Sequence, residues 1–219
     1  MTIKHHLDDA TLMSLSAGTL GEALTAVASA HISMCKKCRS RLRDMDMIGG
    51  IMLSNCPPRA LEKQPHSAGE FAAMHWENGA KDKVMRTQAH SCDLPAPMSW
   101  LVGQDISDIP WKWIGPGVAT HVLPLSEGAT GNLRLLKVAP NKKLPEHGHG
   151  GGELTLVIKG AYRDKFGVFG PSDIADMDED AEHQPIVEPG EDCICVVACE
   201  APAKFKGPIA RMLQPLIGM

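Results

Sequence analysis

The segment HGHGGGELTLVIKG, residues 147–160, decides the fold expected for the second half of the chain. Side chains alternate between the two faces of an extended strand, so His147 and His149 point to the same side. Glu153 follows at an even spacing, although the three glycines before it can bend the path. Gly160 then permits a tight turn. Two imidazoles and a carboxylate gathered in this way indicate a metal site.

A fourth ligand for this site is His183, which lies 30 residues beyond Glu153 and directly before residues 184–188, a predicted strand. Three imidazoles and one carboxylate suit zinc, iron, manganese or nickel, and the ligand types alone do not choose among them. We expect a divalent metal here, with zinc as the first choice. The alternative is an exposed turn that is merely rich in glycine and histidine.

Short segments rich in branched residues surround this site and are punctuated by glycine and proline. These segments are residues 121–125, 132–138, 154–158 and 193–197. Such a pattern predicts a β-sandwich or a small β-barrel. Residues 173–182 hold six acids in ten positions, which is typical of a solvated loop. Cys193, Cys195 and Cys199 share one face of a strand, either as core packing or as a redox-sensitive cluster.

The pattern HxHx3Ex6G with a later histidine resembles the two motifs of the cupin superfamily. Residues 167–171 and His183 stand where the second motif would lie, although its usual Pro-x-Gly is missing. The resemblance implies an all-β cupin barrel that binds a metal through His147, His149, Glu153 and His183. It supports the metal position better than any catalytic role.

The first part of the chain has helical periodicity. Helices are predicted at residues 10–17, with Asp8 or Asp9 as the cap, and at residues 20–31, 35–53 and 68–80. Residues 94–97, Leu-Pro-Ala-Pro, are typical of a linker. We therefore expect an all-α helical domain over residues 1–85, a linker over 86–97 and a β-domain over 98–219.

The spacing His31-x3-Cys35-x2-Cys38 is the strongest local signal in the helical part. In one continuous helix these side chains would share a face, and two thiolates with an imidazole suit tetrahedral zinc. His6 or His5 could supply the fourth ligand, and spacing does not choose between them. The alternative is a pair of buried cysteines beside an unrelated histidine.

A histidine near the N-terminus followed by His-x3-Cys-x2-Cys resembles the zinc-binding anti-sigma family, and His6, His31, Cys35 and Cys38 match its motif. The resemblance covers about the first 80 residues. It implies a helical fold that clamps one group IV (ECF) sigma factor. Joined to a cupin, the chain resembles anti-sigma factors that respond to singlet oxygen and related reactive species.

Apolar faces of the first three helices are then expected to bury against the sigma factor. The residues predicted for this contact are Leu12, Leu15, Leu24, Val27 and Ile48. Covering the sigma domains would block their binding to core polymerase and to promoters together. One sigma factor per chain and no catalytic residue are expected.

Composition argues against nucleic-acid-binding, membrane and secreted proteins. The net charge of −4 and the pI of about 6.2 give no sign of direct nucleic-acid binding. No apolar run approaches the roughly 20 residues that span a bilayer, and the acids near the N-terminus do not fit a signal peptide, so a cytoplasmic protein is expected. Two rivals remain: a metal-dependent cupin dioxygenase or isomerase, and a DNA-binding regulator that uses the basic face of residues 35–53.

Overall fold

The structure is a computed structural model, and it describes residues 2–59, 95 and 105–205. Three helices come first: α1 (Asp9–Ser16), α2 (Glu22–Met34) and α3 (Lys36–Ser54). The helix predicted at residues 68–80 lies outside the described residues. Among the described residues, no helix combines the length and the apolar character needed to cross a membrane.

Local hydrogen bonds explain where α1 begins and how it is held. The Asp8 carboxylate accepts a hydrogen bond from the Thr11 backbone N–H at 2.6 Å, which makes Asp8 the N-cap. Arg41 of α3 donates to the Leu7 carbonyl at 2.6 Å and also pairs with Asp9. The segment before α1 is therefore tied to α3.

Cys35 separates α2 from α3, so the continuous helix assumed in the spacing argument is wrong. Its backbone is extended, with φ −96° and ψ 105°, and it forms the N-cap of α3. The Cys35 Sγ accepts from the Cys38 backbone N–H at 3.5 Å. The helix break still leaves both sulfurs beside the last turn of α2, because the cap turns the Cys35 side chain back over the first turn of α3.

Twelve strands follow among the described residues after the short 3-10 helix η1 (Ile106–Asp108), and the strands that pair with one another run antiparallel. They are β1 (Lys112–Gly115), β2 (Val118–Leu123), β3 (Asn132–Val138), β4 (His147–Gly148), β5 (Glu153–Lys159), β6 (Tyr162–Asp164), β7 (Gly167–Phe169), β8 (Ile174–Met177), β9 (Glu182–His183), β10 (Ile186–Val187), β11 (Cys193–Cys199) and β12 (Lys204–Phe205).

The strands form three sheets. The largest has six strands in the order β1-β2-β3-β11-β5-β8, and two three-stranded sheets have the orders β10-β6-β7 and β12-β4-β9. Gly160 makes the turn after β5 with φ +69°, and a Cβ there would lie 2.5 Å from the Asp192 carbonyl oxygen. The turn predicted at this glycine therefore depends on the absence of a side chain.

The acid-rich segment is not simply a solvated loop. Its first half contains β8, which pairs with β5, and Asp173 is buried there. Residues 178–180 are exposed, as expected. The loop prediction was wrong for the first half because composition alone does not show that backbone amides elsewhere in the chain satisfy these carboxylates.

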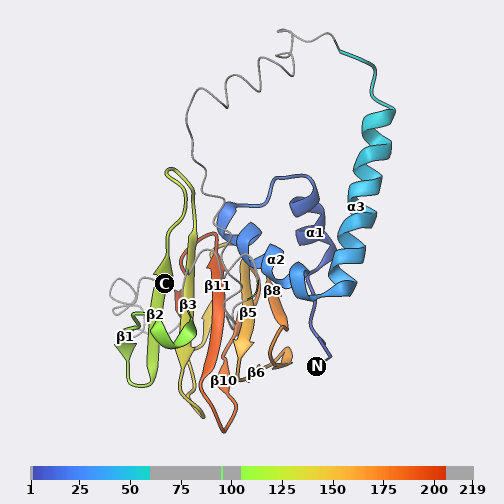
Figure 1. The fold of residues 1–219 in the computed structure, drawn as a ribbon. Coiled ribbons are helices and arrows are strands. Elements are labelled where there is room, and N and C mark those ends of the chain that lie inside the picture. The colour runs from blue at the N-terminus through green and yellow to red at the C-terminus, as the bar shows by residue number, and fades with distance from the viewer. Residues whose placement is uncertain (1, 60–94, 96–104, 206–219) are drawn as a thin grey trace.

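Helix α2 packs on one face of the six-stranded sheet, and α3 contacts both α1 and α2 (Figure 1). Leu24 and Val27 of α2 belong to one hydrophobic core with Leu154, Leu156 and Val196 of the sheet. A second core, on the other side of the sheet, includes Val157, Tyr162, Phe169 and Val187. The alternation along β5 thus divides its side chains between the two cores.

This packing corrects part of the predicted sigma contact. Leu12, Leu24 and Val27 are at most 4% exposed, because they fill the core between helices and sheet. Leu15 is half-buried against the same core, whereas Ile48 is 46% exposed. The first three side chains are therefore structural in this conformation of the chain.

We predict that Leu24→Ala lowers the free energy of unfolding by about 2–5 kcal/mol, because it removes buried methyl groups and leaves a cavity. The same change at Leu53, which is 74% exposed on α3, should change it by less than about 0.5 kcal/mol. Urea unfolding of both variants checks this, and equally small effects would show that α2 does not carry the interface.

Candidate metal centres

The first candidate centre lies where the N-terminal segment, the end of α2 and the start of α3 meet. His6, His31, Cys35 and Cys38 each offer a ligand atom, and these atoms all lie within 4.8 Å of one another. The His6 Nδ1 is 3.3 Å from the Cys35 Sγ and 3.7 Å from the Cys38 Sγ. The His31 Nε2 is 3.3 Å from the Cys38 Sγ.

These separations fit one tetrahedral zinc ion. With Zn–S near 2.3 Å and Zn–N near 2.0 Å, tetrahedral angles place nitrogen and sulfur about 3.5 Å apart. Burial lowers the pKa of His31 to about 4, so its imidazole is neutral at neutral pH, as a ligand must be. Burial also raises the pKa of the Cys38 thiol to about 11, so a thiolate there requires a nearby cation.

The structure distinguishes His6 from His5, which the spacing did not. The His5 ring stacks on Phe169 with centroids 4.1 Å apart, and its Nε2 lies 3.1 Å from the Val168 carbonyl oxygen. Consecutive side chains of an extended segment diverge, so His5 faces the sheet while His6 faces the two cysteines.

His6→Ala should weaken zinc binding at this centre by more than about 100-fold, since even residues that only orient a ligand contribute 10- to 100-fold. His5→Ala is the matched control, because the two residues are neighbours and only His6 reaches the sulfurs. Competition with a chromogenic chelator and metal counting on the purified proteins measure the effect. Equal zinc loss in the two variants would contradict the geometry.

The second candidate centre is built by β4, β9 and β5. His147 of β4 lies directly opposite His183 of β9, and Glu153 begins β5. His149 follows β4 at the start of the glycine turn. A Cβ at Gly150 would lie 2.9 Å from the Ala201 Cβ, so the chain needs a glycine to pass from His149 to Glu153. The ligand atoms of the four predicted residues lie within 4.8 Å of one another.

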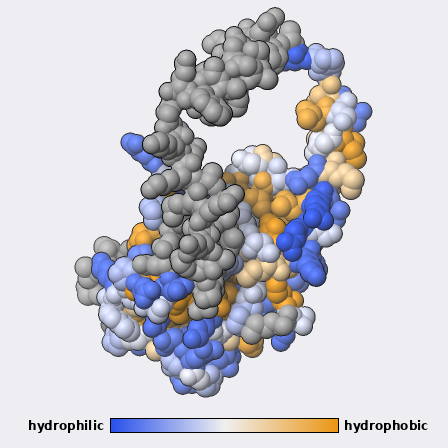
Figure 2. Space-filling view, viewed as in Figure 1, coloured by the Kyte–Doolittle hydropathy of each residue, from blue (hydrophilic) through white to orange (hydrophobic). Residues whose placement is uncertain are grey.

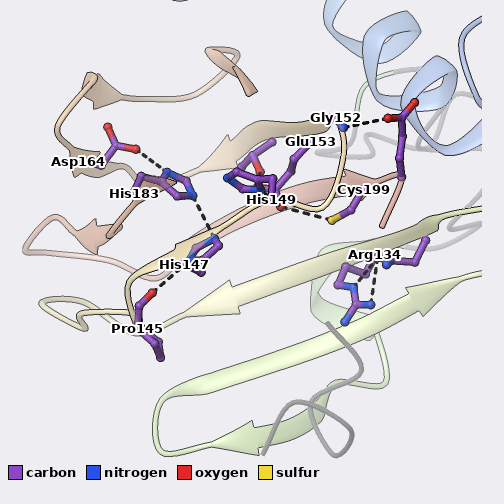
Figure 3. A network of polar contacts seen from close by, with 12 residues as sticks. Arg134, Pro145, His147, His149, Gly152, Glu153, Asp164, His183 and Cys199 are labelled. Carbon is purple, nitrogen blue, oxygen red and sulfur yellow. Dashed lines mark hydrogen bonds and ion pairs between the residues drawn. The ribbon is translucent and has the colours of Figure 1, made fainter. Parts of the chain in front are cut away.

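Hydrogen bonds fix the tautomers of two histidines of this centre, His147 and His183 (Figure 3). The His183 Nδ1 is 2.8 Å from the Asp164 Oδ2, and the His147 Nδ1 is 3.0 Å from the Pro145 carbonyl oxygen. Both partners only accept, so each Nδ1 carries the proton and each Nε2 keeps a lone pair. The two Nε2 atoms are 3.0 Å apart, and a cation between them would relieve the repulsion of their lone pairs.

The surroundings of His149 and Glu153 also favour a bound cation. The His149 Nε2 is buried and has no hydrogen-bond partner among the described residues, which a metal ion would supply. Burial opposes ionisation of Glu153, but the hydrogen bond from His149 and the nearby imidazoles outweigh it and lower its pKa to about 2. The Glu153 carboxylate is therefore ionised, and the Cys199 thiol donates to its Oε2 at 3.3 Å.

Asp164 and Cys199 were missed by the sequence analysis, since neither stands in a recognisable motif. Asp164→Asn should weaken divalent-metal binding at this centre by about 10- to 100-fold, because an uncharged amide oxygen accepts the hydrogen bond from the His183 Nδ1 more weakly than the carboxylate does. Asp180→Asn, on the exposed loop before His183, is the control and should bind as the wild type does. Titration calorimetry with zinc distinguishes the two, and an unchanged affinity in Asp164→Asn would contradict this role.

The turn between β7 and β8 touches the first centre directly. The His31 Nδ1 lies 3.1 Å from the Ser172 carbonyl oxygen, so this turn sets the tautomer that leaves the His31 Nε2 free to bind a metal. The Asp173 carboxylate accepts the backbone N–H groups of Lys4 at 2.6 Å and His5 at 3.0 Å. These contacts were missed by the sequence analysis, because it took the acid-rich segment for a solvated loop.

Two sets of side chains that could each hold a metal ion, one among helices and one in a β-rich domain, define the class of this protein as one with two candidate metal centres. The family model described as the ChrR cupin-like domain matches residues 101–202. The anti-sigma-E factor ChrR of Cereibacter sphaeroides is 37% identical over 215 residues, covering 98% of each chain. The chain therefore belongs to the ChrR family of anti-sigma factors.

One solved structure agrees with this assignment. A crystal structure of Rhodobacter sphaeroides SigE in complex with the anti-sigma ChrR matches with a TM-score of 0.72 and 38% identity, covering 90% of this chain and 99% of that chain. An RmlC-like cupin protein from Ralstonia eutropha is 19% identical with a TM-score of 0.42, covering 48% of this chain and 71% of that chain. The latter similarity is too low to support any inference about function.

Proposed function

We propose that this protein is an anti-sigma factor that binds one ECF-type sigma factor and keeps it from polymerase and promoters. The observation that carries the proposal is the relative at 37% identity across 98% of both chains, which is itself an anti-sigma-E factor. The two chains align over both the helical part and the cupin part. Because the whole chain aligns with a regulatory protein, a regulatory role without catalytic turnover is proposed for both parts.

The described helices offer a surface for such a partner at the C-terminal half of α3. Large apolar side chains are exposed there at 46–74% of their area: Met47, Ile48, Ile51, Met52 and Leu53. Figure 2, viewed as Figure 1, shows this hydrophobic end of α3 above a hydrophilic N-terminal half. A cluster of exposed apolar side chains on one helix is typical of a protein-binding site.

The partner contact is therefore assigned to this α3 surface, with Ile48 kept from the sequence prediction. Leu15 sits at the edge of the covered face. Leu12, Leu24 and Val27 would reach a sigma factor only if the helices moved away from the sheet. Methionine side chains are flexible and adapt well to a partner surface, and Met47 and Met52 are two of the exposed residues.

Affinity capture from the native bacterium tests the class of protein, and a sigma factor recovered in equal amount is the expected result. With that sigma factor, Ile51→Asp should weaken binding by about 30-fold or more, because a charge would be buried at the centre of the contact. The change leaves the fold intact, since Ile51 is 59% exposed.

Val122→Asp is the matched control for this experiment. Val122 is 62% exposed on β2, so the same kind of change is made far from α3. Calorimetry or surface plasmon resonance with the captured sigma factor should give a wild-type affinity for this variant. Equal affinities for both variants would remove the α3 surface from the proposal, and failure to capture any sigma factor would remove the proposed function itself.

We assign zinc to the first centre, because two thiolates and two imidazoles in a tetrahedral arrangement are typical of structural zinc. His6, His31, Cys35 and Cys38 would hold it, and it would keep the N-terminal segment, α2 and α3 in register. A divalent ion, with zinc again the first choice, would be held by His147, His149, Glu153 and His183.

For the domain organisation we propose a helical bundle at residues 1–85, a linker at 86–97 and a barrel-like cupin domain at 98–219.

The cupin domain would serve the release of the sigma factor in response to singlet oxygen or related reactive species. The support is physical continuity between the two centres. Glu153 stands on β5, β5 pairs with β8, and Asp173 next to β8 holds the backbone of Lys4 and His5 beside the zinc ligand His6. A change at the cupin centre therefore has a short, hydrogen-bonded route to the helical centre.

A further inference from the structure

Residues 3–8, here called the N-terminal strap, are attached to both parts of the molecule. On the helical side, the Leu7 side chain is buried in the core, and its carbonyl oxygen accepts a hydrogen bond from Arg41 at 2.6 Å. On the cupin side, the Asp173 carboxylate accepts two backbone N–H groups of the strap. His6, one of the four residues of the first candidate centre, stands between these two attachments.

Asp173, directly before β8, uses both carboxylate oxygens to hold backbone N–H groups. The residue is 4% exposed, and its Oδ1 accepts from Lys4 at 2.6 Å and from His5 at 3.0 Å. Its Oδ2 accepts from the Gly170 N–H at 3.0 Å, and its own carbonyl oxygen accepts from the Val157 N–H of β5 at 3.0 Å. Hydrogen bonds to a carboxylate are stronger than those between neutral groups. The backbone of the strap is therefore fixed relative to the six-stranded sheet.

We infer that Asp173 is a positioning residue for the first candidate centre, and that the cupin domain thereby sets the zinc affinity of the helical centre. The inference rests on the proposed assignment of zinc to this centre. Asp173 is not among the four residues whose ligand atoms converge there, so it acts through the backbone next to His6. Distances between a metal and its ligands are fixed to within about 0.2 Å, so a small displacement of the strap weakens the bond from the His6 Nδ1.

Strand β8 connects this anchor to the second candidate centre. Asp173 stands at its beginning, and Met177 at its end lies opposite Glu153 of β5. A change at the second centre that shifts β8 would therefore lower the zinc affinity of the first centre. Coupling of this kind is reciprocal, so zinc at the first centre would hold the strap on the cupin domain by the same factor.

The test loads the full chain with cobalt(II) and then displaces the cobalt with zinc. Cobalt bound to thiolates has a charge-transfer absorption band that cobalt bound only to nitrogen and oxygen lacks, so this band reports on the first centre. Asp173→Asn should weaken zinc binding there by about 10- to 100-fold, the range for residues that orient a ligand. The physical reason is that an amide offers one acceptor oxygen where the carboxylate offers two.

Glu22→Gln is the matched control. The Glu22 carboxylate accepts from the Ser126 N–H at 2.9 Å, so this change also weakens a contact between the helices and the cupin domain. Glu22 stands at the opposite end of α2 from His31, away from the ligands of the first centre. This variant should bind zinc as the wild type does, and a loss equal to that of Asp173→Asn overturns the inference.

A double variant separates positioning from a general loss of stability. If Asp173 acts through His6, then Asp173→Asn should change the residual zinc affinity of His6→Ala protein by less than about twofold. A merely structural role would weaken binding by the same factor in both backgrounds, and that result overturns the inference.

Lys4→Pro tests the same contact from the strap, because proline has no backbone N–H to donate to Asp173. Lys4 is exposed, so this variant decides the question if Asp173→Asn does not fold, with the melting temperature recorded for both. Zinc binding should again be weaker, and unchanged affinity in either folded variant overturns the inference alone. Absence of the thiolate band from the wild type would overturn the zinc assignment as well, so the two failures are distinguishable.

Discussion

The burial of both faces of β5 and β11 is the constraint on which the rest of the structure depends. All seven residues of β11 are buried, and so are the first five of β5. A strand with apolar residues on both faces must be covered on both sides. The cupin strands cover one side, and α2 covers the other with Leu24, Val27 and Ala28. Helix α2 is therefore needed to cover the apolar face of the sheet, in addition to any role in binding a partner.

This packing places the two candidate metal centres within one connected structure. The four residues of the first candidate centre lie where the N-terminal segment and α2 reach the β7–β8 turn. Ser172 and Asp173 in that turn contact the helical part through backbone and carboxylate oxygens. Ser172 has a positive φ of 72°, which is uncommon for a residue with a side chain. The backbone there is held in a strained conformation in order to present its carbonyl oxygen to His31.

The sequence revealed the ligands better than the surfaces around them. Metal chemistry demands particular residue types at short spacings, so His31, Cys35 and Cys38 could be read without knowing that a helix ends between them. The pairing of β4 with β9 brings His147 opposite His183. The sequence predicted that these two residues come together only through the cupin-like motif, because it did not predict the two short strands. Contacts between distant segments were not accessible, because nothing in the acid-rich run says which amides its carboxylates will meet.

The predicted partner surface shows the same limit. Helical periodicity identified Leu24 and Val27 as one apolar face, but periodicity does not say what covers that face. Here the covering surface is the chain's own sheet. Near the end of α3 the sequence argument selected Ile48 for the partner contact, and Ile48 is one of several large apolar side chains that the structure leaves exposed there.

Three aromatic rings in contact span the boundary between helices and cupin. The His5 ring stacks on Phe169, and Phe169 stacks on Tyr162. His5 is bonded directly to His6, whose imidazole faces the two cysteines. Because stacked rings are in van der Waals contact, a displacement of the Tyr162 ring toward Phe169 would also displace Phe169. Two ring contacts and one peptide bond therefore connect Tyr162 on the cupin side with His6 at the first candidate centre.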